Sequence, residues 1–381
     1  MSSLPRAASV FADSKPHYAL LDGLRGVAAL IVIVYHVFEC FSWSPAPHGY
    51  LAVDFFFVLS GFVIGYAYDD RWGRSLTTRS FFRRRLIRLH PMVVMGAMIG
   101  AVCFVLQGSV KWDGQHVATS FVLFALLMNM LMLPLPVGAR ADVRGNGELF
   151  PLNGPNWSLF FEYVGNILYA LLLRRLPTLG LALVCIASGA GLTWIAVSDG
   201  CLGVGWSMID GGLWSGFVRM LFPYSAGMLL ARLLTVRRQS KAASSASSAW
   251  FIGASAALLL VAIAPLCFGE LPAWAKGLYD ACCVVFLFPA IVWLVAVKTS
   301  SSESPIVRFL GDVSYPLYAV HYPLMYLFYA HIGFSGSLVP IATLSNVWPV
   351  ALALPFACLL LGWLSLRCYD IPVRRWLARH A

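Results

Sequence analysis

The sequence predicts an all-α integral membrane protein, a polytopic bundle of about ten transmembrane helices plus one re-entrant segment. Of its 381 residues 60% are hydrophobic and only 12% are charged, and the mean hydropathy is +0.77. Soluble domains are nearer half apolar and a quarter charged. The basic residues behind the net charge of +10 cluster in short stretches between apolar runs. That pattern sets orientation in a membrane and does not indicate nucleic-acid binding.

A membrane span needs about 20 mostly apolar residues. Eleven segments qualify as candidates: 22–43, 49–68, 90–108, 118–137, 155–173, 177–197, 213–234, 249–268, 276–297, 309–332 and 345–366. The stretch 71–88 carries seven arginines and is therefore expected on the cytoplasmic side, as are both chain ends. Two cytoplasmic ends require an even number of crossings. We therefore expect 118–137, which ends in LPLPVG, to enter the membrane without crossing it.

The domain organisation predicted from this count is a single transmembrane domain over 1–381. A polar cytoplasmic tail is expected over 1–17 and a basic cytoplasmic tail over 367–381. The nine cysteines are scattered through apolar segments without metal-type spacing, so they are interpreted as small core hydrophobes and no metal is expected.

The first candidate span carries Arg25 and His36, which are eleven residues apart. At 100° per residue the two side chains share one helical face, roughly 16 Å apart along the axis, and Asp22 falls on nearly the same face. An arginine reaching for the interface and a histidine bonded to a neighbouring helix would also explain the pair.

The second span places Asp54 inside an aromatic run, where a carboxylate must pair or face water. Ser60 and Gly61 follow, and small residues there are typical of close helix packing. The basic run at 81–91 contains Arg85 and Arg88, three residues apart. They are expected to hold lipid headgroups or to bind a phosphorylated cosubstrate.

Two later segments contribute further candidates. In 153–166, Trp157 is typical of an interfacial anchor, while Glu162 at membrane depth is a functional candidate. In 309–329, His321 lies in an aromatic-rich span with Tyr318, as a site candidate or as a satisfied core histidine.

Together these motifs resemble the acyltransferase-3 family of membrane O-acyltransferases. The resemblance covers roughly 18–376 and rests on motifs in a fixed order: R-x10-H (Arg25, His36), DFFFVLSGF (Asp54 to Phe62), R-x-x-R-x-x-P (Arg85, Arg88, Pro91), WSL-x-x-E (Trp157, Ser158, Glu162) and SYPLY-x-x-H (Ser314 to His321). Many members carry a soluble hydrolase-like domain after the membrane part. This chain ends at residue 381 and is expected to be the stand-alone form.

The resemblance implies transfer of an acyl group, most often acetyl, from cytoplasmic acyl-CoA to a hydroxyl of a glycan or related acceptor at or across the membrane. It implies that His36 is essential and that Arg25, Arg85 and Arg88 serve the donor. Acyl transfer to a hydroxyl needs a base, and His36 is the expected one, either directly or as a transient acyl carrier. Glu162 or Asp54 is expected to hold its other ring nitrogen.

The remaining candidates, Ser60, Trp157, Ser158, Tyr318 and His321, have no assigned role. The alternative to an enzyme is a transporter or flippase of a glycan or lipid intermediate, which would use the same buried charges as a substrate path. A non-catalytic membrane partner would leave the charges of the first two spans unexplained. The family resemblance favours a multi-pass protein of a bacterial inner membrane.

Overall fold

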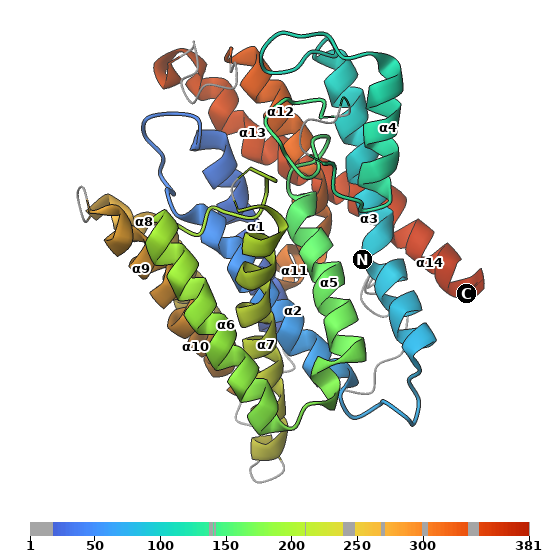
Figure 1. Ribbon diagram of the computed structural model, residues 1–381, viewed down its shortest axis with the longest axis vertical. Coiled ribbons are helices and arrows are strands. Elements are labelled where there is room, and N and C mark those ends of the chain that lie inside the picture. The colour runs from blue at the N-terminus through green and yellow to red at the C-terminus, as the bar shows by residue number, and fades with distance from the viewer. Residues whose placement is uncertain are drawn as a thin grey trace.

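The computed structural model describes residues 18–136, 140, 142–209, 211–238, 248–267, 271–298, 304–333 and 343–380. Within these residues the regular elements are helices and there is no strand (Figure 1). The helices are α1 (Ala19–Phe38), α2 (Ala52–Tyr68), α3 (Thr78–Leu106), α4 (Thr119–Met130), α5 (Asn156–Leu171), α6 (Thr178–Asp199), α7 (Gly212–Arg238), α8 (Ser248–Ile263), α9 (Ala273–Cys282), α10 (Phe288–Val297), α11 (Pro305–Val320), α12 (Tyr322–His331), α13 (Leu344–Ser365) and α14 (Ile371–His380).

The all-α, multi-pass prediction is confirmed. In the described part of the chain, 8 helices are long and apolar enough to cross a membrane. Two other candidate spans form shorter helices, one as α5 and one as α11 and α12, which meet at His321. The count of about ten crossings therefore stays a prediction. At the segment expected to be re-entrant, α4 has 12 residues, or about 18 Å of helix, which is short of a bilayer core.

The basic run at 81–91, whose arginines were expected to share a helical face, is the first part of α3. Thr77 caps this helix, because its hydroxyl accepts a bond from the Ser80 backbone N–H and the Ser80 hydroxyl accepts one from the Thr77 N–H. The helix then continues through Pro91 to Leu106. Since one face of α3 packs inside the bundle, Arg85 is buried and does not reach for lipid headgroups.

Small residues bring the central helices together. A side chain on Gly61 of α2 would lie 1.9 Å from the Tyr224 carbonyl oxygen, and one on Gly227 of α7 would lie 2.1 Å from the Val58 carbonyl oxygen. The backbones of α2 and α7 therefore touch, which confirms close helix packing at the Ser60–Gly61 pair. The first helix, α1, packs on α11 in the same core.

The basic tail expected over 367–381 is helical. A π-helical segment, Leu366–Asp370, joins α13 to α14, so the chain continues as one helical run to His380. Figure 1 shows α14 projecting from the bundle toward the C-terminus. The polar tail expected over 1–17 lies outside the described residues.

Candidate functional site

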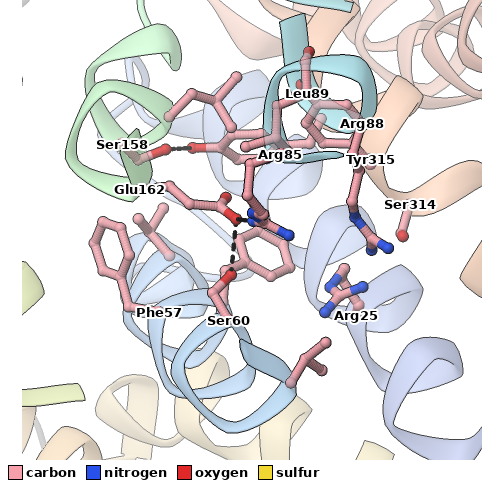
Figure 2. A pocket seen from close by; sticks show the side chains of 15 residues that line it. Arg25, Phe57, Ser60, Arg85, Arg88, Leu89, Ser158, Glu162, Ser314 and Tyr315 are labelled. Carbon is pink, nitrogen blue, oxygen red and sulfur yellow. Dashed lines mark hydrogen bonds and ion pairs between the residues drawn. The ribbon is translucent and has the colours of Figure 1, made fainter. Parts of the chain in front are cut away.

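Two cavities lie along α1, one near each end. We call the first the arginine cavity; its volume is about 60 Å³ and it is lined by Arg25, Val53, Phe56, Phe57, Ser60, Val63, Arg85, Arg88, Leu89, Ser158, Leu159, Glu162, Ser314, Tyr315 and Tyr318. It thus collects all three arginines expected on the donor side. Figure 2 shows their guanidinium groups, from α1 and α3, turned toward the same space.

Glu162 belongs to the arginine cavity and not to His36. Its Oε1 accepts a bond of 2.6 Å from Arg85 Nη2 and one of 3.2 Å from the Ser60 hydroxyl (Figure 2). The expectation that Glu162 holds the His36 ring is therefore corrected. The carboxylate neutralises Arg85, since a buried charge in a membrane requires a partner.

The other two arginines have different surroundings. Arg25 donates to Asp22 Oδ1 at 2.9 Å, which confirms that these two residues share a face of α1. Arg88, in contrast, makes no hydrogen bond or ion pair with any residue that the structure describes. With two carboxylates for three guanidinium groups, the arginine cavity keeps an excess positive charge and suits an anionic ligand.

The second cavity, which we call the histidine cavity, has a volume of about 320 Å³. Its lining is Val32, Tyr35, His36, Glu39, Cys40, Tyr50, Val53, Trp112, Asn146, Glu148, Gly154, Pro155, Trp157, Gly203, Trp206, Arg219, Tyr318, Tyr322, Tyr326 and Tyr329. Aromatic side chains thus form the largest group in its lining. Its candidate acid–base groups are His36 and the carboxyl groups of Glu39 and Glu148.

The His36 ring is held by Glu39, the residue that follows the last turn of the same helix, α1. Its Nδ1 lies 2.9 Å from Glu39 Oε1, and the Tyr329 hydroxyl lies 2.6 Å from the same oxygen and 2.5 Å from the His36 carbonyl oxygen. A carboxylate only accepts, so Nδ1 carries a proton, and in the neutral imidazole Nε2 is then the nitrogen with the lone pair. This is the arrangement that a general base requires, with Glu39 in the place expected for Glu162 or Asp54.

Asp54 is sealed inside the bundle. Its two carboxylate oxygens accept bonds of 2.9 and 2.8 Å from Arg219 on α7, and its side chain is fully buried. Arg219 also donates to the carbonyl oxygens of Val204 and Tyr50. Asp54 therefore acts in this structure as half of an ion pair that ties α2 to α7, not as a group facing His36.

The remaining candidates lie around the two cavities. Trp157 is buried beside the Arg219 guanidinium, 5.0 Å from it, so it is not an anchor at the membrane surface. His321 is fully buried; its Nδ1 lies 2.9 Å from the Tyr318 carbonyl oxygen and its ring stacks on His36 at 5.6 Å. Ser158 and Tyr318 are joined by a 2.6 Å hydrogen bond between their hydroxyl groups.

The histidine cavity contains a carboxyl group with an altered pKa. Burial raises the pKa of Glu148 to about 7, in spite of hydrogen bonds from Tyr326 and Asn146 and the charge of nearby Arg144. Glu148 lies in the segment between α4 and α5. Near neutral pH the Glu148 carboxyl therefore exists in both protonation states.

Glu148 should make the protein less stable as pH rises. Between its usual pKa and about 7 the folded state holds a proton that the unfolded chain has lost. The stabilisation is therefore present at low pH and lost as pH rises through 7, to the extent of about 3 kcal/mol. We expect the melting temperature of the detergent-solubilised protein to fall from pH 5 to pH 8, and Glu148→Gln to reduce that fall. An equal fall in Glu148→Gln and in the exposed control Asp113→Asn would contradict this.

Several residues of the two cavities were not identified as site residues from the sequence. Glu39 had a usable signal, because a position three residues after His36 lies on the same helical face. Arg219 had one as well: it is a charged residue inside an apolar segment and requires a partner. Tyr329 and Glu148 reach the histidine cavity from distant parts of the chain, and nothing local marks them.

The chain matches one family model along most of its length and individual proteins over shorter stretches. A family model described as an acyltransferase domain matches residues 18–367. Protein 2 of the picA locus of Rhizobium radiobacter is 40% identical over 160 residues, 40% of this chain and 81% of that protein. The peptidoglycan O-acetyltransferase OatA of Listeria monocytogenes is 40% identical over 82 residues, 21% of this chain and 12% of that protein. The chain thus matches a small part of the O-acetyltransferase. No solved structure matches.

Proposed function

This chain belongs to the acyltransferase-3 family and is a membrane acyltransferase, and from this premise we propose its donor, its acceptor class and the role of His36. The protein transfers an acyl group, most often acetyl, from cytoplasmic acyl-CoA to a hydroxyl of a glycan or related acceptor. The observation that carries the proposal is the placement of two unlike cavities along one helix, with Arg25 in one and His36 in the other.

The arginine cavity supplies the donor site. Coenzyme A carries phosphate groups, and guanidinium groups bind phosphate through paired N–H donors. In the described part of the structure, the N–H groups of Arg88 make no hydrogen bond and can bind a phosphate, whereas Arg85 already donates a hydrogen bond to Glu162. Arg25 lies roughly 16 Å from His36 along α1, a distance that the extended arm of coenzyme A can follow from the phosphates to the thioester.

His36 supplies the base. The acceptor hydroxyl gives its proton to His36 Nε2 while its oxygen attacks the thioester carbonyl carbon. The new C–O bond forms, the C–S bond breaks, and coenzyme A leaves as a thiolate that takes the proton back from the imidazolium. Glu39 on Nδ1 stabilises that imidazolium. A covalent acyl-imidazole on His36 is the variant route, which ping-pong kinetics and a trapped intermediate would identify.

The histidine cavity supplies the acceptor site. Its walls offer broad aromatic faces, and its polar groups include Asn146, Glu39 and Glu148. Such a lining suits a molecule with apolar ring faces and many hydroxyls, as a sugar has. We place the protein in a bacterial inner membrane with the Arg88 end of the bundle toward the cytoplasm, because the arginine-rich stretch 71–88 leads into it.

The proposal is tested by radiolabel transfer. Membranes containing the wild-type protein are incubated with acetyl-CoA labelled in the acetyl group, and membrane glycans and extractable lipids are then separated and counted. Label in one fraction that depends on the protein supports the proposed donor and identifies the acceptor pool. Absence of label from every fraction contradicts the proposed donor.

Arg88→Ala should weaken donor binding selectively. A hydrogen bond to a charged group contributes about 1.5–3 kcal/mol, so the apparent KM for acetyl-CoA is expected to rise at least about tenfold with little change in kcat. Removing Arg88 leaves no carboxylate unpaired, whereas removing Arg85 would strip Glu162 of its partner. The matched control is Arg83→Ala, an exposed arginine of α3 that does not line the cavity. Equal KM values for both variants would remove Arg88 from the donor site.

A further inference from the structure

We propose that the Tyr318 hydroxyl stabilises the oxyanion that forms when the acyl group is transferred. The inference rests on the proposed function, because it assigns a further catalytic residue to that reaction. It starts from the position of Tyr318 between the two cavities.

Tyr318 lies in the walls of both cavities. Among the residues that the structure describes, only Val53 and Tyr318 line both the arginine cavity and the histidine cavity. The Val53 side chain has no polar atom. Among the described residues, Tyr318 is therefore the only one with a side-chain hydrogen-bond donor that belongs to the lining of both cavities.

The proton of this hydroxyl is available. The Ser158 hydroxyl donates to the Pro155 carbonyl oxygen at 3.0 Å, and a serine hydroxyl has a single proton. While the Ser158 proton is in that bond, Tyr318 is the donor in the 2.6 Å contact between the two hydroxyl groups, and either hydroxyl can donate when it is not. An acyl carbonyl oxygen can take the place of the Ser158 oxygen as acceptor without leaving the Tyr318 proton unpaired.

The surroundings of Tyr318 hold its ring in place before the reaction. Phe56 packs edge-on against the ring, with centroids 5.2 Å apart. The Tyr318 carbonyl oxygen contacts Nδ1 of His321, whose ring stacks on His36. Tyr318 and the proposed base thus both contact His321, and a donor held in place before the reaction is what oxyanion stabilisation requires.

The chemistry follows from the attack on the thioester. As the acceptor oxygen bonds to the carbonyl carbon, negative charge develops on the carbonyl oxygen. The Tyr318 O–H donates a hydrogen bond to that oxygen and keeps its proton throughout. When the C–S bond breaks, the carbonyl re-forms and the Tyr318 O–H again donates its hydrogen bond to the Ser158 oxygen.

The test compares tyrosine variants by label transfer from acetyl-CoA in membranes, with rates normalised to the amount of folded protein. Tyr318→Phe keeps the ring and removes the donor. Loss of one oxyanion donor lowers kcat by about 10²–10³-fold, so we expect that loss with the apparent KM for acetyl-CoA nearly unchanged. Tyr279→Phe is the matched control, because its hydroxyl also donates to a buried partner, the Val261 carbonyl oxygen, and it lines neither cavity.

Ser158→Ala separates donation from simple packing. It removes only the resting acceptor of the Tyr318 proton, so it is expected to lower kcat far less than Tyr318→Phe does. Wild-type kcat in Tyr318→Phe, or an equal loss in Ser158→Ala, overturns the inference while leaving the proposed function intact. Failure of the wild type to transfer acetyl from acetyl-CoA overturns both.

Discussion

Replacing His36 with alanine is expected to lower acyl transfer by about 10²–10⁴-fold, the range that a positioned general base contributes. His36 lines the histidine cavity, and Glu39, itself bonded by Tyr329, occupies Nδ1, so Nε2 is the ring nitrogen left to act as the base. Alanine removes the base and leaves the arginine cavity unchanged. The apparent KM for acetyl-CoA should therefore stay near its wild-type value while the rate of label transfer collapses.

The control for this prediction is His90→Ala. His90 lies on α3, lines neither cavity and contacts Tyr163, so its loss is expected to leave transfer intact. Transfer that persists in His36→Ala would remove His36 from the chemistry. Normal acylation combined with lost export of the acceptor would instead favour the transport alternative.

The features that the sequence predicted correctly are those carried by short-range periodicity. Eleven residues separate Arg25 from His36, and one helix places them in two cavities that lie along it. Length and hydropathy identified the helices, and the small Gly61 marked a true close approach. Each of these depends on neighbours within a few turns of one helix, which a sequence displays directly.

The pairing of charges between helices was not predictable in the same way. Asp54 meets Arg219 across 165 residues and Arg85 meets Glu162 across 77 residues. A buried charge requires a partner, but that rule names no partner when several opposite charges are available. The sequence therefore favoured Glu162 and Asp54 as partners of His36, although Glu39 stood one turn away on the same helix.

Whether the Arg85 and Arg88 side chains face the lipid or the interior of the bundle also could not be predicted from the sequence. Arg85 and Arg88 on a helical face fit lipid headgroups and fit a phosphate site equally well. Helix packing decides between these two uses. The helix α3 continues past Pro91, and Arg85 forms an ion pair with Glu162 of α5 inside the bundle. Such a choice depends on the whole arrangement of helices, which no local pattern contains.

Asp54→Ala is expected to destabilise the protein strongly, because Asp54 forms a buried ion pair with Arg219. The Arg219 guanidinium is 2% exposed, and removing one partner of a buried ion pair costs about 3–5 kcal/mol because the other charge stays buried alone. Two carbonyl oxygens still bind Arg219, which keeps the expected loss toward the lower end. Thermal unfolding of the detergent-solubilised protein, read as a fall in melting temperature, measures this loss.

The double variant Asp54→Leu with Arg219→Met tests whether the pair acts only in folding. Apolar replacement of both partners often restores or exceeds the original stability, so the melting temperature should return toward the wild-type value. If the pair is structural, acetyl transfer per folded molecule should return with it. Wild-type stability in Asp54→Ala together with lost transfer would instead assign Asp54 to the chemistry. The outcome thus separates a charge that holds α2 against α7 from a charge that takes part in the reaction, a distinction that burial alone does not make.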